Sequence, residues 1–463
     1  MSYLAGSGYQ SARNIAPSRP GKRRLTLLLM AAIPLALCLR LQAQASRPVN
    51  SQAPDLSGEW ELTWIRFGEA NVDRVQLQMS GDKITGKVFG NRNIEGTISG
   101  DKVELKVIGD DKKTIATLNG TVRNGEMSGD MKLFGDNLTW TARRARVRPP
   151  EAPRVHNFDP KEFHNYFSAT IPPALRIYPG DTVHTETVDA GGVDKDGKRR
   201  SLGGNPLTGP FYVEGAVRGD TLVVHFNRIQ LNRDRAQSGS TIVLSALNPG
   251  YVQDKKYVPD FDSAWRLDKE RGVAMLAKPT DKLKDFVVPL QPMLGCVGVA
   301  PPRNQSFLSG DLGGYGGNMD YNQVREGVTL YFPVNHAGAL LYVGDGHAAQ
   351  GDGELTGDAL ETSMEVEFTV DLIQGKSFGG PRAENDEYIM AIGIANSLPE
   401  AVQRATTQLA RWIEDDYKLN PSEIAVVLGF AIHYDIAELV DPHINVVAKI
   451  RKSALAQIRK GDN

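Results

Sequence analysis

The stretch from Gly310 to Glu361 places the strongest constraint on how this chain can fold. It has a high density of glycines and lies between runs that are typical of β-strands. Glycine loses more backbone freedom on folding than any other residue, so such a density is costly to order. The cost is usually tolerated where the backbone turns sharply or passes close to a ligand. The stretch therefore predicts strands and turns built around a binding site.

Side chains in the same stretch are of the types that bind metal ions. Asp345 and His347 are two positions apart, so an extended backbone would direct both to the same side. Glu354 follows shortly after them in a second glycine-rich turn. Carboxylate oxygens suit hard cations, and imidazole nitrogen suits zinc. The alternative is a turn aspartate beside a surface histidine.

Other carboxylates and amides could join such a site. Asn318 and Asp320 end a glycine run and could either coordinate an ion or cap a turn. Glu361 opens an alternating strand, where an exposed charge is the default. Glu214 lies in an apolar strand, so its carboxylate is either exposed on the outer face or buried with a shifted pKa. Asp189 follows an earlier strand.

Several long blocks resemble the acetamidase/formamidase family. They read GGNMD, FPVNHAGALLYVGDGHAAQGDGE and ALE within the glycine-rich stretch. Three further blocks precede them in the family's order, at Pro179–Gly192, Asn205–Phe226 and Pro292–Pro302. The resemblance runs from about Phe163 to the C-terminus and does not include the first 150 residues.

The resemblance implies hydrolysis of formamide, acetamide or another small amide to ammonia and a carboxylate. A metal ion can polarise the carbonyl group and activate water, and a nearby carboxylate can move the proton. We expect a divalent ion, zinc first because of His347, with calcium or magnesium also suited to carboxylates. The expected catalytic carboxylates are Glu354, Glu214 and Glu361, and the expected metal ligands are Asp345, His347, Asp320, Asp189 and Asn318. Whether Glu354 is the general base or a ligand stays open.

Two other functions remain possible from the sequence. The first is hydrolysis of a different or larger amide, a cyclic amide or an ester at the same site. The second is a non-catalytic protein that binds a metal or a ligand. A secretion signal and an additional β domain do not belong to the family pattern, so they leave the substrate open.

The N-terminal segment has the pattern of a signal peptide. Basic residues precede the apolar run Leu25–Leu39, and Ala43-Gln44-Ala45 follows with small residues where a signal peptidase cuts. We therefore expect a periplasmic or secreted protein whose mature form does not enter the membrane. The net charge of −2 gives no reason to expect nucleic acid as a partner. We expect a homo-oligomer. After cleavage only Cys296 remains, and its apolar neighbours predict a buried, inert thiol.

The fold class predicted from the strand pattern is mainly β, of the β-rich α+β type. We expect a signal peptide over 1–45, a small β-barrel or sandwich over 46–147, a proline-rich linker over 148–162 and a larger β-sandwich-like catalytic domain over 163–463. In the small domain, turns are predicted at Ser80–Asp82, Ser99–Asp101 and Ser128–Asp130.

One or two helices are expected late in the chain. Ser397–Glu400 and Asn420–Glu423 each have the pattern of a capping box with proline in the first turn. Met364–Val370 alternates apolar and polar residues, which predicts a half-buried strand. Ile444–Ile450 reads as a terminal strand.

Overall fold

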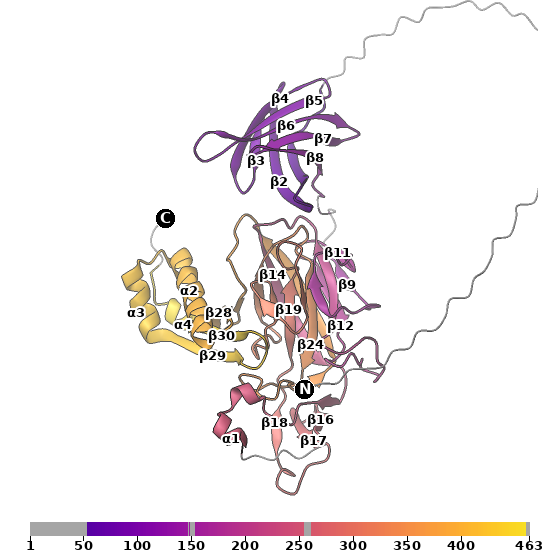
Figure 1. Ribbon diagram of the computed structural model, residues 1–463, viewed down its shortest axis with the longest axis vertical. Helices are drawn as coiled ribbons and strands as arrows, with labels where there is room; N and C mark the ends of the chain where they lie inside the picture. The colour runs from indigo at the N-terminus through magenta and orange to yellow at the C-terminus, as the bar shows by residue number, and fades with distance from the viewer. Residues whose placement is uncertain (1–52, 147, 149–152, 254–260, 460–463) are drawn as a thin grey trace, which may run out of the picture. The chain divides into compact units, whose positions relative to one another are not determined.

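The computed structural model describes residues 53–146, 148, 153–253 and 261–459. The predicted signal peptide lies outside these residues, as does much of the predicted linker. Within the described ranges, no helix combines the length and the apolar character needed to cross a membrane. The predicted fold class is confirmed, because strands dominate the chain and helices are few (Figure 1).

Eight antiparallel strands near the N-terminus close into a barrel (Figure 1, indigo to purple). The barrel closes because β1 pairs with β2 along one edge and with β8 along the other. Buried and exposed side chains alternate along β5, as a two-residue period requires. The strands are β1 (Gly58–Arg66), β2 (Glu69–Ser80), β3 (Lys83–Val88), β4 (Arg92–Ser99), β5 (Lys102–Ile108), β6 (Thr114–Arg123), β7 (Glu126–Leu133) and β8 (Asp136–Arg144).

Two of the three predicted turns in this region connect strands, and the third prediction is wrong. Gly81 and Gly100 adopt φ values of +63° and +62° between consecutive strands. Gly129 instead lies inside β7. A Cβ atom at Gly129 would stand only 2.5 Å from the Cα atom of Gly120 on the neighbouring strand. Glycine at this position therefore allows close approach of two strands rather than a turn.

The larger domain contains two sheets that share one apolar core. Phe211 from one sheet packs edge-on against Phe368 from the other, with ring centroids 5.2 Å apart. Both rings are fully buried. Buried side chains from both sheets join them in one continuous cluster. Such interdigitation of two inner faces agrees with the sandwich-like layering predicted from the sequence.

The first sheet follows the order β18 (Val287–Pro289), β17 (Val273–Leu276), β16 (Ala264–Asp268), β15 (Arg235–Gln237), β25 (Glu361–Thr362), β24 (Leu341–His347), β19 (Met293–Val299), β22 (Gly316–Asn318) and β21 (Leu312–Gly313). Two further strands extend it, since β13 (Leu207–Val213) pairs with β24 and β11 (Leu175–Ile177) pairs with β13.

The second sheet follows the order β29 (Ile432–Glu438), β30 (Ile444–Arg451), β28 (Tyr388–Ala395), β27 (Arg382–Glu384), β23 (Thr329–Pro333), β14 (Thr221–Leu231), β26 (Met364–Ile373), β12 (Thr182–Glu186) and β9 (Val155–Asn157). A short separate pair joins β10 (Tyr166–Ser168) to β20 (Ser306–Leu308). Strand β26 alternates buried and partly buried residues over most of its length, as the sequence pattern predicts.

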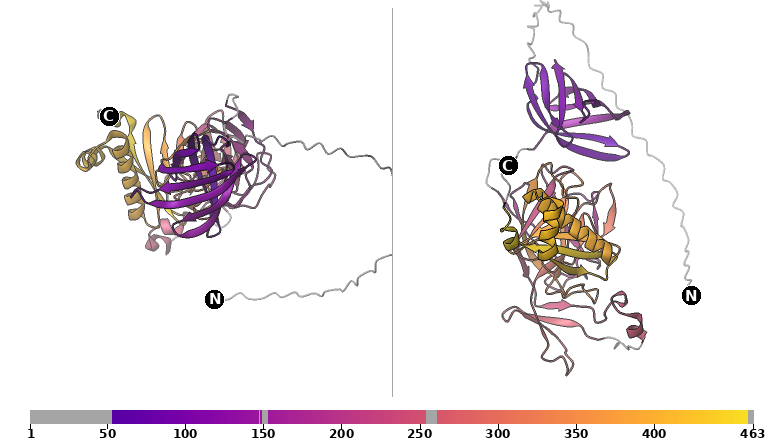
Figure 2. Two further views of the ribbon diagram at one scale, coloured as in Figure 1. Left: turned by 90° about the horizontal axis from the view of Figure 1, so that it is seen from above. Right: turned by 90° about the vertical axis from the view of Figure 1, so that its left-hand side faces the viewer.

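Two helices of more than two turns pack on this second sheet (Figure 2). Helix α2 (Leu398–Tyr417) buries Ala401, Ala405 and Leu409 against β28 and β30. Helix α3 (Pro421–Ala431) follows it. Three short helical turns complete the described residues: η1 (Leu244–Ala246), α1 (Pro249–Gln253) and α4 (Lys452–Leu455).

The two predicted capping boxes differ in the structure. At α3 both halves are present, because the side chain of Asn420 accepts from the backbone of Glu423 while the carboxylate of Glu423 accepts from the backbone of Asn420. At α2 the hydroxyl of Ser397 accepts from the backbone of Glu400. The carboxylate of Glu400 instead accepts from Arg404 one turn later, which leaves only half of the box.

Candidate metal centre and active site

Six buried polar residues from the glycine-rich stretch converge at one end of the first sheet. Asp345 and His347 end β24, and Glu361 opens the neighbouring β25. Asn318 and Asp320 follow from β22. Glu354 comes from the loop between β24 and β25. All six residues are at most 7% exposed.

His347 is the centre of this cluster. Its Nε2 atom lies 3.4 Å from Oδ2 of Asp345 and 3.2 Å from Oε1 of Glu361. Its Nδ1 atom lies 2.9 Å from Oε1 of Gln350. An amide oxygen only accepts hydrogen bonds, so Nδ1 carries the proton and Nε2 faces the carboxylates. This is the tautomer and orientation that a metal-binding histidine needs.

The donor atoms fall into three overlapping groups, each within 4.8 Å across, that could hold a metal ion. The first contains Asp320, Asp345 and His347. A second contains His347, Glu354 and Glu361. The third joins Asp320 to Glu438 and Asp441, which come from the end of β29 and the turn that follows it. The third group offers oxygen atoms alone, whereas the first two include imidazole nitrogen.

Several carboxylate oxygens in the cluster have no hydrogen-bond partner among the described residues, although they are buried. They are Oδ1 of Asp320, Oδ1 of Asp345, Oε2 of Glu361 and Oε2 of Glu438. A buried, unpaired carboxylate oxygen is costly unless a cation or a proton compensates it. The donor set therefore fits one or more divalent cations.

The pKa shifts of the site residues also favour a site for a divalent cation. Burial raises the pKa of Asp320 and of Glu354 well above the ordinary range, and neighbouring carboxylates raise both further. Burial also raises the pKa of Glu361 to about 7, with the charge of Asp345 adding to it. Burial opposes the charged form of His347, but Glu361 and Asp345 together hold its pKa well above the ordinary value. The cluster thus holds more carboxyl groups than His347 alone can balance, so without a cation they favour the protonated form.

The backbone is strained at several of these positions. Asp320, Asp345 and Glu354 adopt φ values of +41°, +59° and +46°. The left-handed region costs a non-glycine residue on the order of 1 kcal/mol or more. Such residues cluster at functional sites, where the surroundings hold them in place. The expectation of a regular extended backbone from Asp345 to His347 is therefore wrong at Asp345, although both side chains enter the cluster.

Five polar residues at the site were not predicted as part of it. Asn205 donates to Oδ2 of Asp345 over 3.1 Å, and Gln350 orients His347. The thiol of Cys296 donates to Oδ1 of Asn318 over 2.6 Å. Glu438 and Asp441 supply the oxygen-only group. The sequence signal for these last two is weak, since they are only a pair of carboxylates three residues apart beside apolar residues.

Cys296 is buried, as its apolar neighbours predict. Burial raises the pKa of its thiol well above the ordinary value, and the charge of Asp345 raises it further. A nucleophilic cysteine requires the thiolate, which this environment disfavours.

Two of the predicted site residues lie outside the cluster. Oδ2 of Asp189 pairs with Arg233 over 2.6 Å, and Arg233 also donates to the backbone oxygen of Glu361. Asp189 thus contacts the site through Arg233 rather than directly. Glu214 lies elsewhere, where its carboxylate pairs with Arg176 over 2.6 Å and with Arg146 over 3.1 Å.

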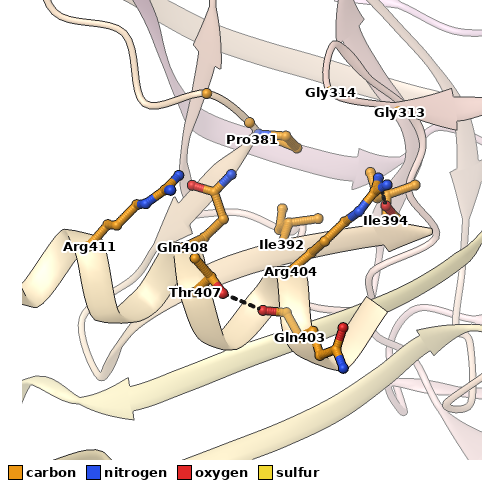
Figure 3. A pocket seen from close by; sticks show the side chains of 12 residues that line it. Gly313, Gly314, Pro381, Ile392, Ile394, Gln403, Arg404, Thr407, Gln408 and Arg411 are labelled. Carbon is orange, nitrogen blue, oxygen red and sulfur yellow. Dashed lines mark hydrogen bonds between the residues drawn. The ribbon is translucent and has the colours of Figure 1, made fainter. Parts of the chain in front are cut away.

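A cavity of about 460 Å³ opens beside Glu354. A different cavity of about 260 Å³ lies over α2, where Gln408 and Arg411 point toward Pro381 and Arg404 extends toward Ile394 (Figure 3). The described residues that line this second cavity include no carboxylate, histidine or cysteine. Of these two cavities, the one beside Glu354 adjoins the metal-binding cluster.

The amino-acid sequence of this chain is similar to those of known proteins. The chain is 25% identical over 266 residues to a formamidase from Methylophilus methylotrophus, which covers 46% of this chain and 64% of that protein. It is 26% identical over 282 residues to an acetamidase from Mycolicibacterium smegmatis, which covers 46% of this chain and 66% of that protein. The chain thus spans just under two thirds of the length of these relatives.

The fold of this chain is similar to the folds of solved structures. A predicted acetamidase/formamidase from Thermoanaerobacter tengcongensis superposes with a TM-score of 0.57 at 27% identity, over 66% of this chain and 99% of that one. An acetamidase from Yersinia enterocolitica superposes with a TM-score of 0.56 at 28% identity, over 66% of this chain and 95% of that one. The sequence pattern of the Acetamidase/Formamidase family matches residues 152–306 and 314–440, more than half of the chain. The chain therefore belongs to the Acetamidase/Formamidase family.

Proposed function

We propose that this chain is a metal-dependent amidase that hydrolyses the linear C–N bond of small amides to ammonia and a carboxylate. The observation that carries the proposal is the double position of Glu354. Its carboxylate belongs to the cluster with His347 and Glu361, and it also lines the neighbouring cavity. The distant similarity to a formamidase and an acetamidase supports the reaction class.

The metal ion in this proposal is zinc at the groups that contain His347, because imidazole nitrogen suits zinc. Calcium or magnesium suits the oxygen-only group around Asp320, Glu438 and Asp441. A bound divalent ion supplies Lewis-acid polarisation of the amide carbonyl and lowers the pKa of water. Gln350 and Asn205 hold His347 and Asp345 in place for this role.

Glu354 carries the proton in this proposal. When ionised, its carboxylate can accept a proton from the attacking water, and when protonated it can deliver that proton to the leaving nitrogen. Burial and the neighbouring carboxylates raise its pKa, which favours the form that delivers the proton. Glu361 accepts from the backbone N–H of Ala359 and faces His347, so it acts as a ligand or as support for the histidine.

The test combines metal analysis of the purified chain with ammonia release from formamide and acetamide. Asp345→Ala and His347→Ala should each lower metal content and remove turnover together, because both effects follow from loss of a ligand. Glu354→Gln should keep the metal while kcat falls by about 100-fold or more. Glu414→Gln, which changes an exposed glutamate on α2, is the matched control and should change neither.

Full metal content and full activity in both Asp345→Ala and His347→Ala would show that the site is elsewhere. Joint loss of metal and activity in Glu354→Gln would make Glu354 a ligand instead of the base. Metal content without turnover of any amide, cyclic amide or ester would favour the non-catalytic alternative. Turnover of a lactam or an ester in preference to acetamide would keep the site but change the reaction.

We also propose export and self-association, which rest on the sequence alone. The mature N-terminus is expected near Ser46, after Ala43-Gln44-Ala45. N-terminal sequencing of protein from the native host tests export, and intact Met1 on cytoplasmic protein would contradict it. Light scattering of the purified chain tests the homo-oligomer, and a monomeric mass would contradict it.

A further inference from the structure

The cavity beside Glu354 is lined by both polar and aromatic residues. Glu354 and Gln350 line it on the side of the metal-binding cluster. Three apolar side chains line it as well. They are Trp265 from β16, Phe286 from the segment before β18, and Val288 from β18. A reacting amide next to Glu354 would therefore have an apolar, aromatic surface within the same cavity.

Other residues hold the aromatic side chains of the cavity in a defined arrangement. The indole N–H of Trp265 donates to the hydroxyl of Ser238 over 3.0 Å. The ring of Trp265 meets the ring of Phe286 edge-on, with centroids 6.4 Å apart and an interplanar angle of 63°. Trp265 and Val288 also pack against a buried apolar cluster that includes Ala349 and Leu360, two further residues of the cavity wall. This support fixes the indole before any ligand arrives.

Phe286, by contrast, is half exposed to solvent. An exposed aromatic ring that borders a cavity gains free energy when an apolar group covers it. Formamide and acetamide have at most one methyl group, which is too small to cover the rings of both Trp265 and Phe286. The volume of about 460 Å³ is within the usual range for sites that bind larger organic ligands.

We propose that this cavity selects amides that carry an uncharged apolar group of about phenyl size, with Trp265 and Phe286 as the residues that determine this specificity. The inference rests on the amidase function proposed above. The ring could be attached to the carbonyl carbon, as in benzamide, or to the nitrogen, as in acetanilide. The cavity would contact the ring in the same way in either position. Comparison of benzamide with acetanilide shows which position it accepts.

Binding provides the first test, because it does not depend on turnover. Benzamide and acetanilide are titrated into the full chain while tryptophan fluorescence is recorded. At least one of them should change the fluorescence, and Trp265→Phe should remove that change while an aromatic ring stays in place. Phe286→Ala should weaken the Kd by about 10-fold, as expected for loss of one apolar contact surface. Phe430→Ala, which removes an exposed ring on α3, is the matched control and should leave the Kd unchanged.

Turnover provides the second test. The ratio of kcat/KM for the preferred aromatic amide to that for acetamide should exceed about 10 in the wild-type chain and fall by about 10-fold in Phe286→Ala. Release of ammonia from benzamide or of aniline from acetanilide shows which side of the amide carries the ring.

No fluorescence change with either compound, or a change that persists in Trp265→Phe, would overturn the inference, as would an equal turnover ratio in Phe286→Ala and wild type. Acetamide turnover without aromatic binding would thus refute the inference and leave the amidase proposal standing. Aromatic binding that changes the fluorescence of Trp265 and is weakened in Phe286→Ala, without turnover of any amide, would support the cavity assignment and refute the amidase proposal.

Discussion

A Cβ atom at Gly295 would lie 2.5 Å from Oδ2 of Asp345. The same atom would lie 2.4 Å from Oδ1 of Asp320 and 2.9 Å from Cε1 of His347. Gly295 belongs to β19, whose neighbour β24 carries Asp345 and His347. The absence of a side chain at this one position therefore leaves the space into which the cluster converges.

Gly295→Ala should consequently displace the carboxylates of Asp345 and Asp320. We expect loss of metal content and a fall in kcat/KM of about 100-fold or more, because misplacement of about 1 Å is enough for such an effect. Metal analysis and ammonia release measure it. Gly310→Ala is the matched control, since a Cβ atom there meets nothing within 4 Å. Equal metal content in both variants would contradict the proposed site.

Glu214 should affect stability rather than chemistry. Its carboxylate is buried, and both of its arginine partners are partly exposed. Glu214→Gln removes the negative charge from both pairs, so the free energy of unfolding should fall by about 1–2 kcal/mol, less than for a fully buried pair. Denaturant unfolding and metal analysis test this, and metal content should stay unchanged. Lost turnover with unchanged stability would instead restore Glu214 as a catalytic carboxylate.

The helix cap at Asn420 allows a stability test outside the site. Its side chain accepts from the backbone N–H groups of Ser422 and Glu423. Asn420→Ala should lower the free energy of unfolding by about 1 kcal/mol without changing activity. Denaturant unfolding measures the loss, and Ser422→Ala serves as the control because its backbone N–H stays in place. A Ser422→Ala loss as large as that of Asn420→Ala would show that the cap is not the cause.

Those predicted residues that lie close together along the chain also lie close together in the structure. Asn318, Asp320, Asp345, His347, Glu354 and Glu361 come from one stretch, and the structure brings them together. Alternation along β26 and the capping box of α3 could also be predicted, because local periodicity and turn chemistry determine them. The box at α2 could not, because Glu400 pairs with Arg404 instead.

Apart from Gln350, which is close to His347 in sequence, the unpredicted site residues reach the cluster through long-range strand pairing, and no local sequence pattern encodes such pairing. A bridge between Gly353 and Glu438 brings the end of β29 to the loop of Glu354. Pairing of Cys296 with Gly344 and of Leu207 with Gly344 brings Cys296 and Asn205 to Asp345. Glu214 was predicted at the site as a carboxylate within an apolar strand. In the structure it pairs instead with Arg146 and Arg176, which are too far from Glu214 in sequence for a local pattern to predict the pairing.

Stability of the metal-free chain should depend on pH in a direction that the site determines. Burial raises the pKa of Glu361 to about 7, and burial with the charge of Glu438 raises that of Asp441 to about 7. The ordinary values are 4.5 and 3.8, so between about pH 4 and about pH 7 the folded chain binds more protons than the unfolded chain. Its free energy of unfolding must then fall as the pH rises through this window.

His347 acts in the same direction. Its pKa is raised in the folded chain, so the stability that it contributes is present at low pH and is lost as the pH rises through that value. We expect the free energy of unfolding of the chelator-treated chain to fall by about 1–3 kcal/mol between about pH 5 and about pH 8.

Added zinc or calcium should reverse this loss. A cation replaces the protons on the carboxylates, so it should stabilise the chain strongly at about pH 8 and little at about pH 5. Thermal unfolding with and without the cation measures both effects. Glu361→Gln is the informative variant, because it removes one of the titrating groups and should reduce both the pH dependence and the gain from the cation. A chelator-treated chain that grows more stable toward about pH 8, with no response to added cation, would show that these carboxylates do not form a metal site.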